Sequence, residues 1–371
     1  MFAVGFLARP VGAWLMGVYA DRAGRKAALV ASVALMCLGS LVVAVLPGYA
    51  TIGQAAPIIL TIARLVQGLS VGGEYGASAT YMSEVAGKAR RGFWSSFQFV
   101  TLIGGQLCAL GVLILLQHTL TKGQLEDWGW RIPFVIGALL AVVVFWIQNG
   151  LEETRSFEAV DHSVKRMSTT WRLISHHPTE TAMVFVLSSA GGLSFYCFTT
   201  YMQKFLTNTA HFSRDVATQI SAVSLVAYLL VIPLFGWLGD KLGRRVLLVA
   251  SFGVGSLVVW PIMSALSVAK DANLALAMVC ATVVILAGYS AVNAVVKAEL
   301  FPTHVRALGV SLPYAVGNAV FGGTAEYVAL WFKQSGHESG FYIYVGIIEA
   351  AACLVALRMR DTQRLSLLVE D

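Results

Sequence analysis

Charged residues are scarce in this chain. They make up 12% of its 371 residues, whereas soluble domains carry about a quarter. Hydrophobic residues account for 57%, and the mean hydropathy is +0.72. This composition excludes an ordinary soluble domain and indicates a chain that lies in a lipid bilayer.

Catalytic and metal-binding patterns are also lacking. The five cysteines lie inside apolar segments and show no paired spacing, which excludes a disulfide framework. No histidine lies in the middle of an apolar segment, and there is no phosphate-binding loop or nucleophile motif. We therefore expect no enzyme activity, no catalytic residues, no cofactor and no metal site.

Long apolar runs are what the chain does contain. A run of about 20 residues crosses a hydrocarbon core of about 30 Å as a helix. Helices are expected because the runs are longer than barrel strands and lack alternation. The eleven predicted spans are 1–20, 27–46, 56–86, 92–117, 131–149, 181–206, 216–238, 245–266, 272–298, 306–332 and 340–358.

Most basic residues between the spans fall in alternate loops, among them Arg22 and Arg25 in the first loop and Lys88, Arg90 and Arg91 in the third. The positive-inside rule predicts that these loops and the C-terminus are cytoplasmic. The net charge of +6 is thus spread over loops. Because it forms no single patch, we expect no nucleic-acid partner.

One motif occurs twice, as GVYADRAGRK (17–26) and GWLGDKLGRR (236–245). A second landmark follows each copy, with Glu84 and Arg91 at the same spacing as Glu299 and Arg306. The chain is therefore predicted to contain two parallel repeats. Two spans precede the motif in the second repeat but only one in the first, so the repeat predicts a twelve-helix design whose first helix is missing here.

The predicted domains follow from this duplication. Residues 1–149 form an N-terminal helix bundle that lacks its first helix, and residues 181–358 form a C-terminal bundle. The charged stretch 150–180 is expected to be a cytoplasmic linker with an amphipathic part on the bilayer surface. Residues 359–371 are a cytoplasmic tail.

Arg9 is the first candidate binding residue, because it lies close to the middle of an apolar span. An arginine there costs about 2.5–3.5 kcal/mol on insertion scales, so a partner or water must offset it. A guanidinium suits a bidentate bond to a substrate carboxylate. The alternative is a structural ion pair between helices.

The span 56–86 carries a polar face that includes Arg64, Gln67, Glu74 and Tyr75. Arg64 is interpreted as a second anion contact, with a structural ion pair as the alternative. Glu74 is a candidate proton carrier, because a dry cavity favours a protonated carboxyl. Otherwise it is a permanently paired carboxylate. A stripe of Gly68, Gly72 and Gly76 on another face is typical of close helix packing.

Other polar residues are weaker cavity candidates, because tyrosines and amides inside helices often only satisfy neighbouring backbone groups. The substrate-binding set is completed by Gln106, Tyr314 and Asn318, and the remaining candidates are Gln98, Tyr196, Tyr201, Lys204, Asn293 and Glu326.

Several segments together are similar to the major facilitator superfamily, and within it to the metabolite:proton symporter family. They are the two motif copies, RLVQGLSVGGEYGASATYMSE (64–84), LEETRSFE (151–158) and KAELFPTHVRALG (297–309). The resemblance implies an all-α, polytopic membrane protein with the major facilitator fold of two six-helix bundles, here with 11 helices and the first helix missing. The family's first helix, with its acidic residues near the cavity, has no counterpart.

Five further segments make the resemblance more specific, to transporters of dicarboxylates within this family. They are GFLARPVG, VTLIGGQL, DWGWRIPF, FTTYMQKFL and GGTAEYVAL. They imply proton-coupled uptake of a dicarboxylate such as alpha-ketoglutarate by alternating access, in a bacterial inner membrane. The expected partners are this carboxylate, protons and the lipid bilayer, with the protein as a monomer. The alternatives are symport of another solute (citrate, shikimate, proline or betaine) or a truncated, transport-inactive or solute-sensing relative.

The repeated motif is expected to form a cytoplasmic gate. Asp21 and Asp240 lie at helix ends, where they can pair with Arg91 or Arg306 or cap a facing helix. Such contacts would form in one state of an alternating-access cycle and break in the other, a role that the resemblance supports. The alternative is topology signalling by the basic residues alone. The predicted gate residues are Gly17, Asp21, Arg22, Gly24, Arg25, Glu84, Arg91, Gly236, Asp240, Gly243, Arg244, Glu299 and Arg306.

Overall fold

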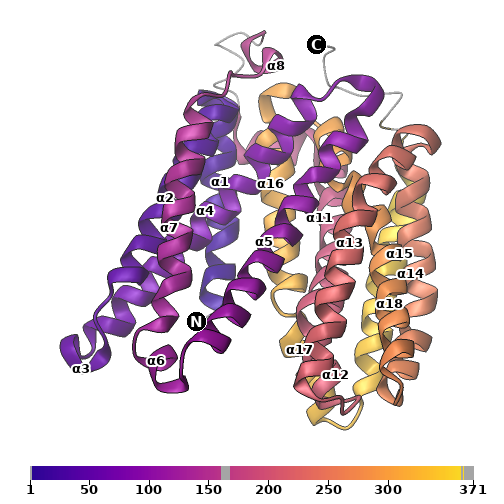
Figure 1. The fold of residues 1–371 in the computed structure, drawn as a ribbon. Helices are drawn as coiled ribbons and strands as arrows, with labels where there is room; N and C mark the ends of the chain where they lie inside the picture. Colours follow the sequence, from indigo (N-terminus) through magenta and orange to yellow (C-terminus); the bar gives the residue numbers. More distant parts are fainter. Residues whose placement is uncertain (1, 160–167, 361, 363–371) are drawn as a thin grey trace. The chain divides into compact units, whose positions relative to one another are not determined.

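The chain is mostly helical in the part that the computed structural model describes, residues 2–159, 168–360 and 362 (Figure 1). None of these residues lies in a β-strand. An all-helical fold is what a chain with long apolar runs requires, because a helix satisfies every backbone hydrogen bond within its own segment.

Each of the eleven predicted spans is mostly helical, with bounds that differ from the prediction by a few residues. The span 306–332 contains a turn at Gly323 and Thr324. Short helices, among them α3 (Tyr49–Ile52), α6 (Lys122–Asp127), α8 (Arg155–Glu158) and α10 (Thr170–His176), connect the long ones. The helices that make up the predicted spans are α1 (Phe2–Ala23), α2 (Arg25–Val45), α4 (Ala55–Val85), α5 (Arg91–Thr119), α7 (Ile132–Asn149), α11 (Pro178–Phe195), α12 (Met202–Asn208), α13 (Arg214–Leu242), α14 (Arg244–Ser267), α15 (Ala272–Leu300), α16 (Arg306–Gly317), α17 (Ala325–Gln334) and α18 (Glu338–Arg358).

Among the described residues, nine helical segments are long and apolar enough to cross a membrane. They correspond to the predicted spans other than 1–20 and 306–332. This arrangement fits a multi-pass membrane protein.

Two spans are interrupted by a wide helical turn. The first is η3 (Tyr196–Tyr201), between α11 and α12, and the second is η5 (Asn318–Gly322), between α16 and α17. Gly192 makes room for Asn318, because a Cβ atom there would lie 2.1 Å from the amide oxygen of Asn318. Such turns insert an extra residue into a helix and redirect its side chains.

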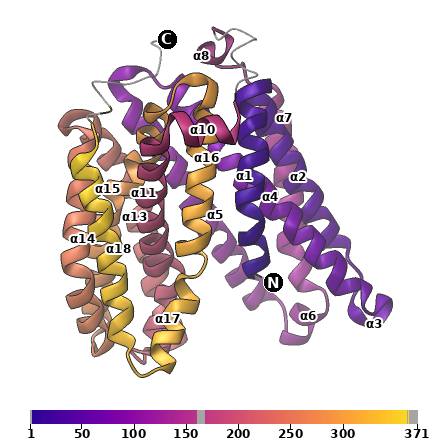
Figure 2. The same ribbon diagram turned by 180° about the vertical axis from the view of Figure 1, so that it is seen from behind.

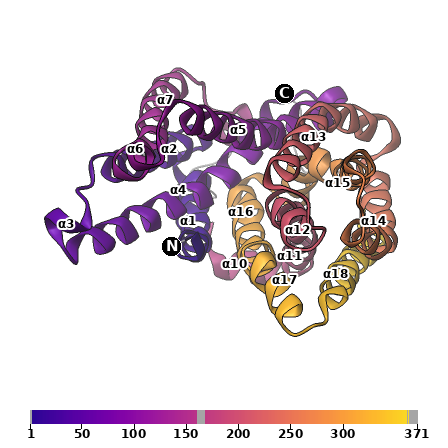
Figure 3. The same cartoon turned by 60° about the horizontal axis from the view of Figure 1, so that its bottom comes forward.

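The chain folds into two compact units that do not follow chain order. Unit 1 comprises Met1–Tyr81, Gly105–His176 and Thr303–Ala315, and unit 2 comprises the remaining residues. In unit 1, α2 packs against α7 and α1; in unit 2, α15 packs against α13 and α14, and α14 against α18 (Figure 3). The units reflect packing in space, so the domain boundaries expected from the sequence stay a prediction.

Glycines bring α4 against its neighbours in unit 1. A Cβ atom at Gly68 would lie 2.4 Å from the carbonyl oxygen of Gly5, and one at Gly72 would lie 2.1 Å from that of Arg9. Gly76 similarly faces Ser311 on α16. The prediction that this stripe is a helix contact is therefore confirmed, and the contact places Arg9 on α1 next to α4.

Candidate functional site

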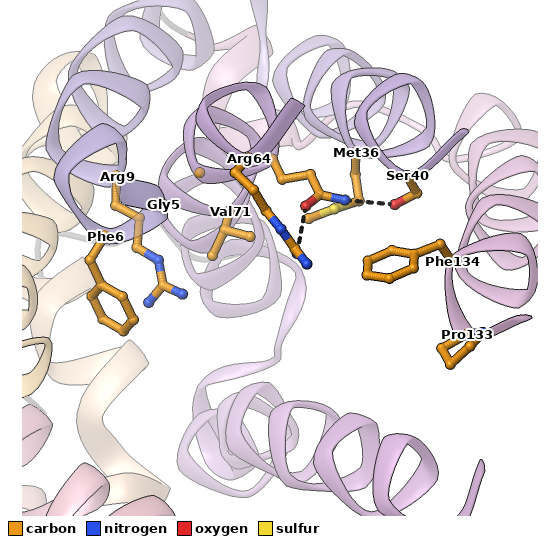
Figure 4. A pocket seen from close by; sticks show the side chains of 11 residues that line it. Gly5, Phe6, Arg9, Met36, Ser40, Arg64, Val71, Pro133 and Phe134 are labelled. Atoms are coloured by element: carbon orange, nitrogen blue, oxygen red, sulfur yellow. Dashed lines mark hydrogen bonds between the residues drawn. The ribbon is translucent and has the colours of Figure 1, made fainter. Parts of the chain in front are cut away.

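A cavity of about 460 Å³ lies inside unit 1, among α1, α2, α4 and α7 (Figure 4). Its volume is within the range of small-molecule sites. The lining residues are Gly5, Phe6, Arg9, Met36, Ser40, Arg64, Gln67, Gly68, Val71, Pro133 and Phe134.

Arg9 reaches the cavity from α1. Its guanidinium carbon lies 3.7 Å from the ring centroid of Phe6, one turn earlier on the same helix. This cation–π contact stabilises the charge and restricts where the guanidinium can move. Arg9 remains partly accessible, so its charge can meet a molecule in the cavity.

Arg64 reaches the same cavity from α4 and is held by a chain of polar contacts. Its Nη1 donates a hydrogen bond to Gln67 Oε1 at 3.0 Å, and Gln67 Nε2 donates to Ser40 Oγ on α2 at 3.1 Å (Figure 4). The ring of Phe134 on α7 lies 5.0 Å from the guanidinium carbon. Three helices therefore fix the position of one cation.

The charges of this cavity have a single sign. Arg9 and Arg64 are its basic residues, and no Asp or Glu lines it in the part of the chain that the structure describes. Two guanidinium groups in an otherwise apolar and amide-lined space attract an anion. Their geometry suits a carboxylate, which accepts paired hydrogen bonds from a guanidinium.

The structure brings only some of the predicted binding residues together. Arg9, Arg64 and Gln67 line the cavity, whereas Gln106 on α5 and Asn318 on η5 are not among its lining residues. Glu74 also lies outside the lining, further along α4 than Arg64.

Two of the predicted binding residues contact each other instead. The rings of Tyr75 and Tyr314 are stacked, with their centroids 3.5 Å apart and their planes at 10°. Tyr75 is buried, and the stack joins α4 to α16 within unit 1. This pair is a packing contact of the described structure, and a substrate role for it stays a prediction.

Sequence reasoning missed Phe6, Met36, Ser40 and Phe134, which also line the cavity. Phe6 could have been found from its position one turn before Arg9 on the same helix. No local signal identifies Ser40 or Phe134, because each contributes through contacts with α4, a helix distant in sequence.

The first copy of the repeated motif caps a helix. Asp21 is fully buried, and its carboxylate accepts hydrogen bonds from the backbone N–H groups of Ala307 and Leu308, both at 3.0 Å. These are donors of the first turn of α16. Ser168 Oγ also donates to Asp21, at 3.1 Å, and Arg25 Nη1 lies 3.4 Å from the carboxylate.

The basic residues of this copy hold backbone carbonyl groups. Arg25 donates to the carbonyl oxygens of Ala20 and Thr303, and Arg22 donates to that of Ser168. Arg25 is fully buried. The first copy is thus a buried charge network that joins α1, α2 and the start of α16, all within unit 1.

The second copy has the same design in unit 2. The carboxylate of Asp240 accepts hydrogen bonds from the N–H groups of Gly92, at 2.7 Å, and Phe93, at 2.9 Å, in the first turn of α5. Arg244 Nη2 lies 3.5 Å from Asp240, and Arg244 also pairs with Glu299. Of the arrangements considered for the two aspartates, helix capping is therefore present at both.

The remaining predicted gate residues lie around these caps. Glu299 is buried and also faces Arg91, whose Nη1 lies 3.9 Å away. Glu84, which corresponds to Glu299 in the first repeat, and Arg306, which corresponds to Arg91 in the second repeat, are buried as well.

Glycines of the motif serve close approach and turning. A Cβ atom at Gly17 would lie 2.5 Å from Ser311 Oγ, and one at Gly236 would lie 2.8 Å from the carbonyl oxygen of Gly92. Gly24 and Gly243 have φ angles of 112° and 95°, a backbone conformation that residues with a side chain rarely adopt. They let the chain leave one helix and start the next immediately.

Known proteins resemble this chain over nearly its whole length. The Major Facilitator Superfamily pattern matches residues 1–320 and 184–367. The alpha-ketoglutarate permease of Escherichia coli (strain K12) is 49% identical over 362 residues, covering 97% of this chain and 82% of the permease. The citrate-proton symporter of Salmonella typhi is 31% identical, covering 97% of this chain and 83% of the symporter.

The shikimate transporter of Escherichia coli (strain K12) is 30% identical, covering 98% of this chain and 84% of that transporter. Among solved structures, the proton:xylose symporter XylE shares the fold with a TM-score of 0.82 and 17% identity, covering 98% of this chain and 86% of XylE. The chain belongs to the Major Facilitator Superfamily.

Proposed function

We propose that this protein is a secondary active transporter that takes up alpha-ketoglutarate, or a similar dicarboxylate, together with protons by alternating access. The observation that carries the proposal is the cavity of unit 1. Arg9 and Arg64 both line it, and no carboxylate of the described residues does. A cation is costly inside a membrane-spanning segment unless an anion or water offsets it. A substrate with two carboxylates would place an anion beside both guanidinium groups.

Two carboxylates match two guanidinium groups. Arg64 is held in place by Gln67, while Phe6 supports Arg9 and Phe134 supports Arg64. Because the donors are already oriented, less conformational freedom is lost when the substrate binds. Gln67, Tyr75, Gln106, Tyr314 and Asn318 are proposed to contribute polar contacts in the course of the cycle.

The relatives agree with an acidic substrate. Three of them are named for alpha-ketoglutarate, citrate and shikimate, which are carboxylates. The proline/betaine transporter of Escherichia coli (strain K12), named for zwitterions, is 28% identical. The higher identity to the permease favours alpha-ketoglutarate among these solutes.

The capped helix ends are proposed to act as a cytoplasmic gate. Asp21 holds the start of α16 and Asp240 holds the start of α5, each with several short contacts. A set of contacts that forms or breaks together gives a helix end two discrete positions. In this proposal the gate is closed while the caps are formed and opens when they separate.

Glu74 is proposed to carry the proton. It lies on α4, the helix that also bears Arg64, so a movement of α4 changes the surroundings of both groups. A carboxyl inside a membrane-spanning helix favours its neutral form and ionises when water or a cation approaches.

The protein is proposed to lie in a bacterial inner membrane as a monomer, with its C-terminus in the cytoplasm.

The test is uptake of labelled alpha-ketoglutarate into vesicles that contain the purified protein, with and without an inward proton gradient. Accumulation that requires the gradient supports the proposal, and its absence contradicts it. Arg9→Lys and Arg64→Lys should each weaken apparent affinity about tenfold or more, because lysine cannot form the bidentate bond. Arg214→Lys, an exposed position on α13, is the matched control.

Competition identifies the substrate. Unlabelled citrate, shikimate, proline and betaine are added during uptake, and the proposed dicarboxylate should compete at the lowest concentration. If a zwitterion competes better, the two-arginine clamp is not the specificity site. Substrate binding without uptake would instead indicate the solute-sensing alternative.

A further inference from the structure

Glu349 is a buried carboxyl near the middle of α18 that neither the cavity of unit 1 nor the capped helix ends involve. It is 4% exposed. Its helix packs against both α11 and α14 within unit 2 (Figure 2). A carboxyl inside a membrane-spanning helix bundle is costly, and its retention usually has a functional reason.

The contacts of Glu349 are few and specific. Ser194 on α11 donates a hydrogen bond from Oγ to Oε1 of Glu349 at 2.5 Å. Gly255 on α14 faces Oε2, and a Cβ atom at that position would lie 2.5 Å from this oxygen. The glycine therefore makes room for a carboxyl group.

The second oxygen of Glu349 is buried without a hydrogen-bond partner among the described residues. Within that part of the chain, no Lys, Arg or His forms a recorded ion pair with Glu349. The buried Cys197 on η3 is a titratable neighbour, because its thiol lies within electrostatic reach of the Glu349 carboxylate. An unpaired carboxylate in such surroundings is strongly disfavoured, whereas the neutral acid is tolerated.

A void of about 10 Å³ is lined by Glu349, Ser251 and Thr282 together with apolar side chains. This is about the space that one water molecule occupies. The hydroxyl groups of Ser251 and Thr282 already donate to the backbone carbonyl groups of Ile285 and Val279, so each can accept a hydrogen bond from that water, and the protonated carboxyl can donate one. A small separation of α14 from α18 would connect the void to further water.

We propose that Glu349 is a second proton-binding site, which holds a proton while α18 is closed on α11 and α14 and releases it when water enters the void. This inference rests on the proposed proton-coupled transport, to which it adds a site beyond Glu74. Ser194 and Gly255 position the carboxyl for this exchange.

The first test does not depend on transport. Dicyclohexylcarbodiimide modifies protonated carboxyl groups in apolar surroundings, and peptide mass spectrometry measures its attachment to Glu349 of the membrane-embedded protein. We expect labelling that falls as the pH rises from about 5 to about 9, a range that covers the ionisation of shifted carboxyl groups. Constant or absent labelling overturns the proposal. Glu326, which is partly exposed and paired with Lys204, is the comparison carboxyl.

The second test compares gradient-driven accumulation with substrate exchange at equal pH. At a gradient of one pH unit each coupled proton supports about tenfold accumulation, so Glu349→Gln should lower the ratio of accumulation to exchange about tenfold. Asp215→Asn, at an exposed position in the first turn of α13, should leave that ratio unchanged. An unchanged ratio in Glu349→Gln overturns the second site. If the wild-type protein carries no dicarboxylate, the proposed function fails, and the labelling result still decides whether Glu349 exchanges a proton.

Discussion

Gln67 joins Arg64 to Ser40. Its amide accepts a hydrogen bond from the guanidinium at 3.0 Å and donates one to the serine hydroxyl at 3.1 Å. The orientation of one cavity cation on α4 therefore depends on a residue of α2. Two neighbouring helices cannot shift past each other without disturbing this cation.

Gln67→Met tests this dependence, because methionine has a similar length and removes both hydrogen bonds. Hydrogen bonds to charged groups contribute about 1.5 kcal/mol or more, so we expect the KM for dicarboxylate uptake to rise about tenfold. Ser40→Ala, which removes only the more distant contact, should have a smaller effect. Gln203→Met, which loses a bond to Thr218 in unit 2, is the control. An unchanged KM in Gln67→Met would mean that Arg64 needs no such support.

Asp240→Asn should destabilise the protein although the side chain keeps its shape. One amide oxygen can still accept from Gly92 or Phe93, but the NH₂ group then faces the other backbone N–H, and the ion pair with Arg244 is lost. Loss of a helix cap costs about 1–2 kcal/mol. Thermal unfolding of the purified protein in detergent measures the change.

Asp21→Asn should behave in the same way, because Asp21 accepts from Ala307 and Leu308. Asp271→Asn is the matched control, since Asp271 caps α15 through one bond to Asn273 that asparagine can preserve. Equal unfolding temperatures for all three variants would show that the buried caps add no stability.

Gly17→Ala should weaken the packing of α1 on α16. The added methyl group would lie 2.5 Å from Ser311 Oγ and 2.9 Å from the Cα atom of Leu308. Overpacking against a backbone atom costs about 1–3 kcal/mol, which lowers the unfolding temperature. Gly105→Ala, where nothing lies within 4 Å, should leave it unchanged or raise it, because alanine favours a helix. A lower unfolding temperature for Gly105→Ala than for Gly17→Ala would contradict the close contact of Gly17 with α16.

Tyr75→Leu should destabilise unit 1 more than Tyr75→Phe. Phenylalanine keeps the stacked ring against Tyr314, whereas leucine loses it, and aromatic pairs contribute about 0.5–1.5 kcal/mol beyond burial. The unfolding temperature in detergent distinguishes the two variants. Tyr327→Leu, at an exposed position, controls for removing a tyrosine. If both Tyr75 variants unfold at the same temperature, the ring contact does not contribute to stability.

The helices could be predicted because each apolar run is much longer than the few residues by which its predicted ends can be in error. The break at Asn318 could not, because it depends on tertiary contacts: a Cβ atom at Gly317 would lie 2.9 Å from the carbonyl oxygen of Phe185 on α11. Gly322 and Gly323 are a local signal for a break in this span, but they do not show that a wide turn begins at Asn318. The single predicted span 306–332 is therefore divided in the structure into α16, η5 and α17.

The charged residues that line the cavity could be predicted from the sequence. Arg9 and Arg64 stand out because a cation in an apolar run is rare, whereas Phe134 and Ser40 resemble ordinary helix residues. Which amides face the cavity depends on how helices are rotated against each other. Sequence alone could therefore not separate Gln67, which lines the cavity, from Gln106, which does not.

The two compact units have a consequence for biosynthesis. Thr303–Ala315 belongs to unit 1, and Met82–Gly104 belongs to unit 2. Unit 1 is therefore incomplete until the ribosome has added residues more than a hundred positions beyond its other segments. Early helices must wait in the bilayer with an unfilled contact face, and two separately expressed half-genes would have to meet in one membrane to complete either unit.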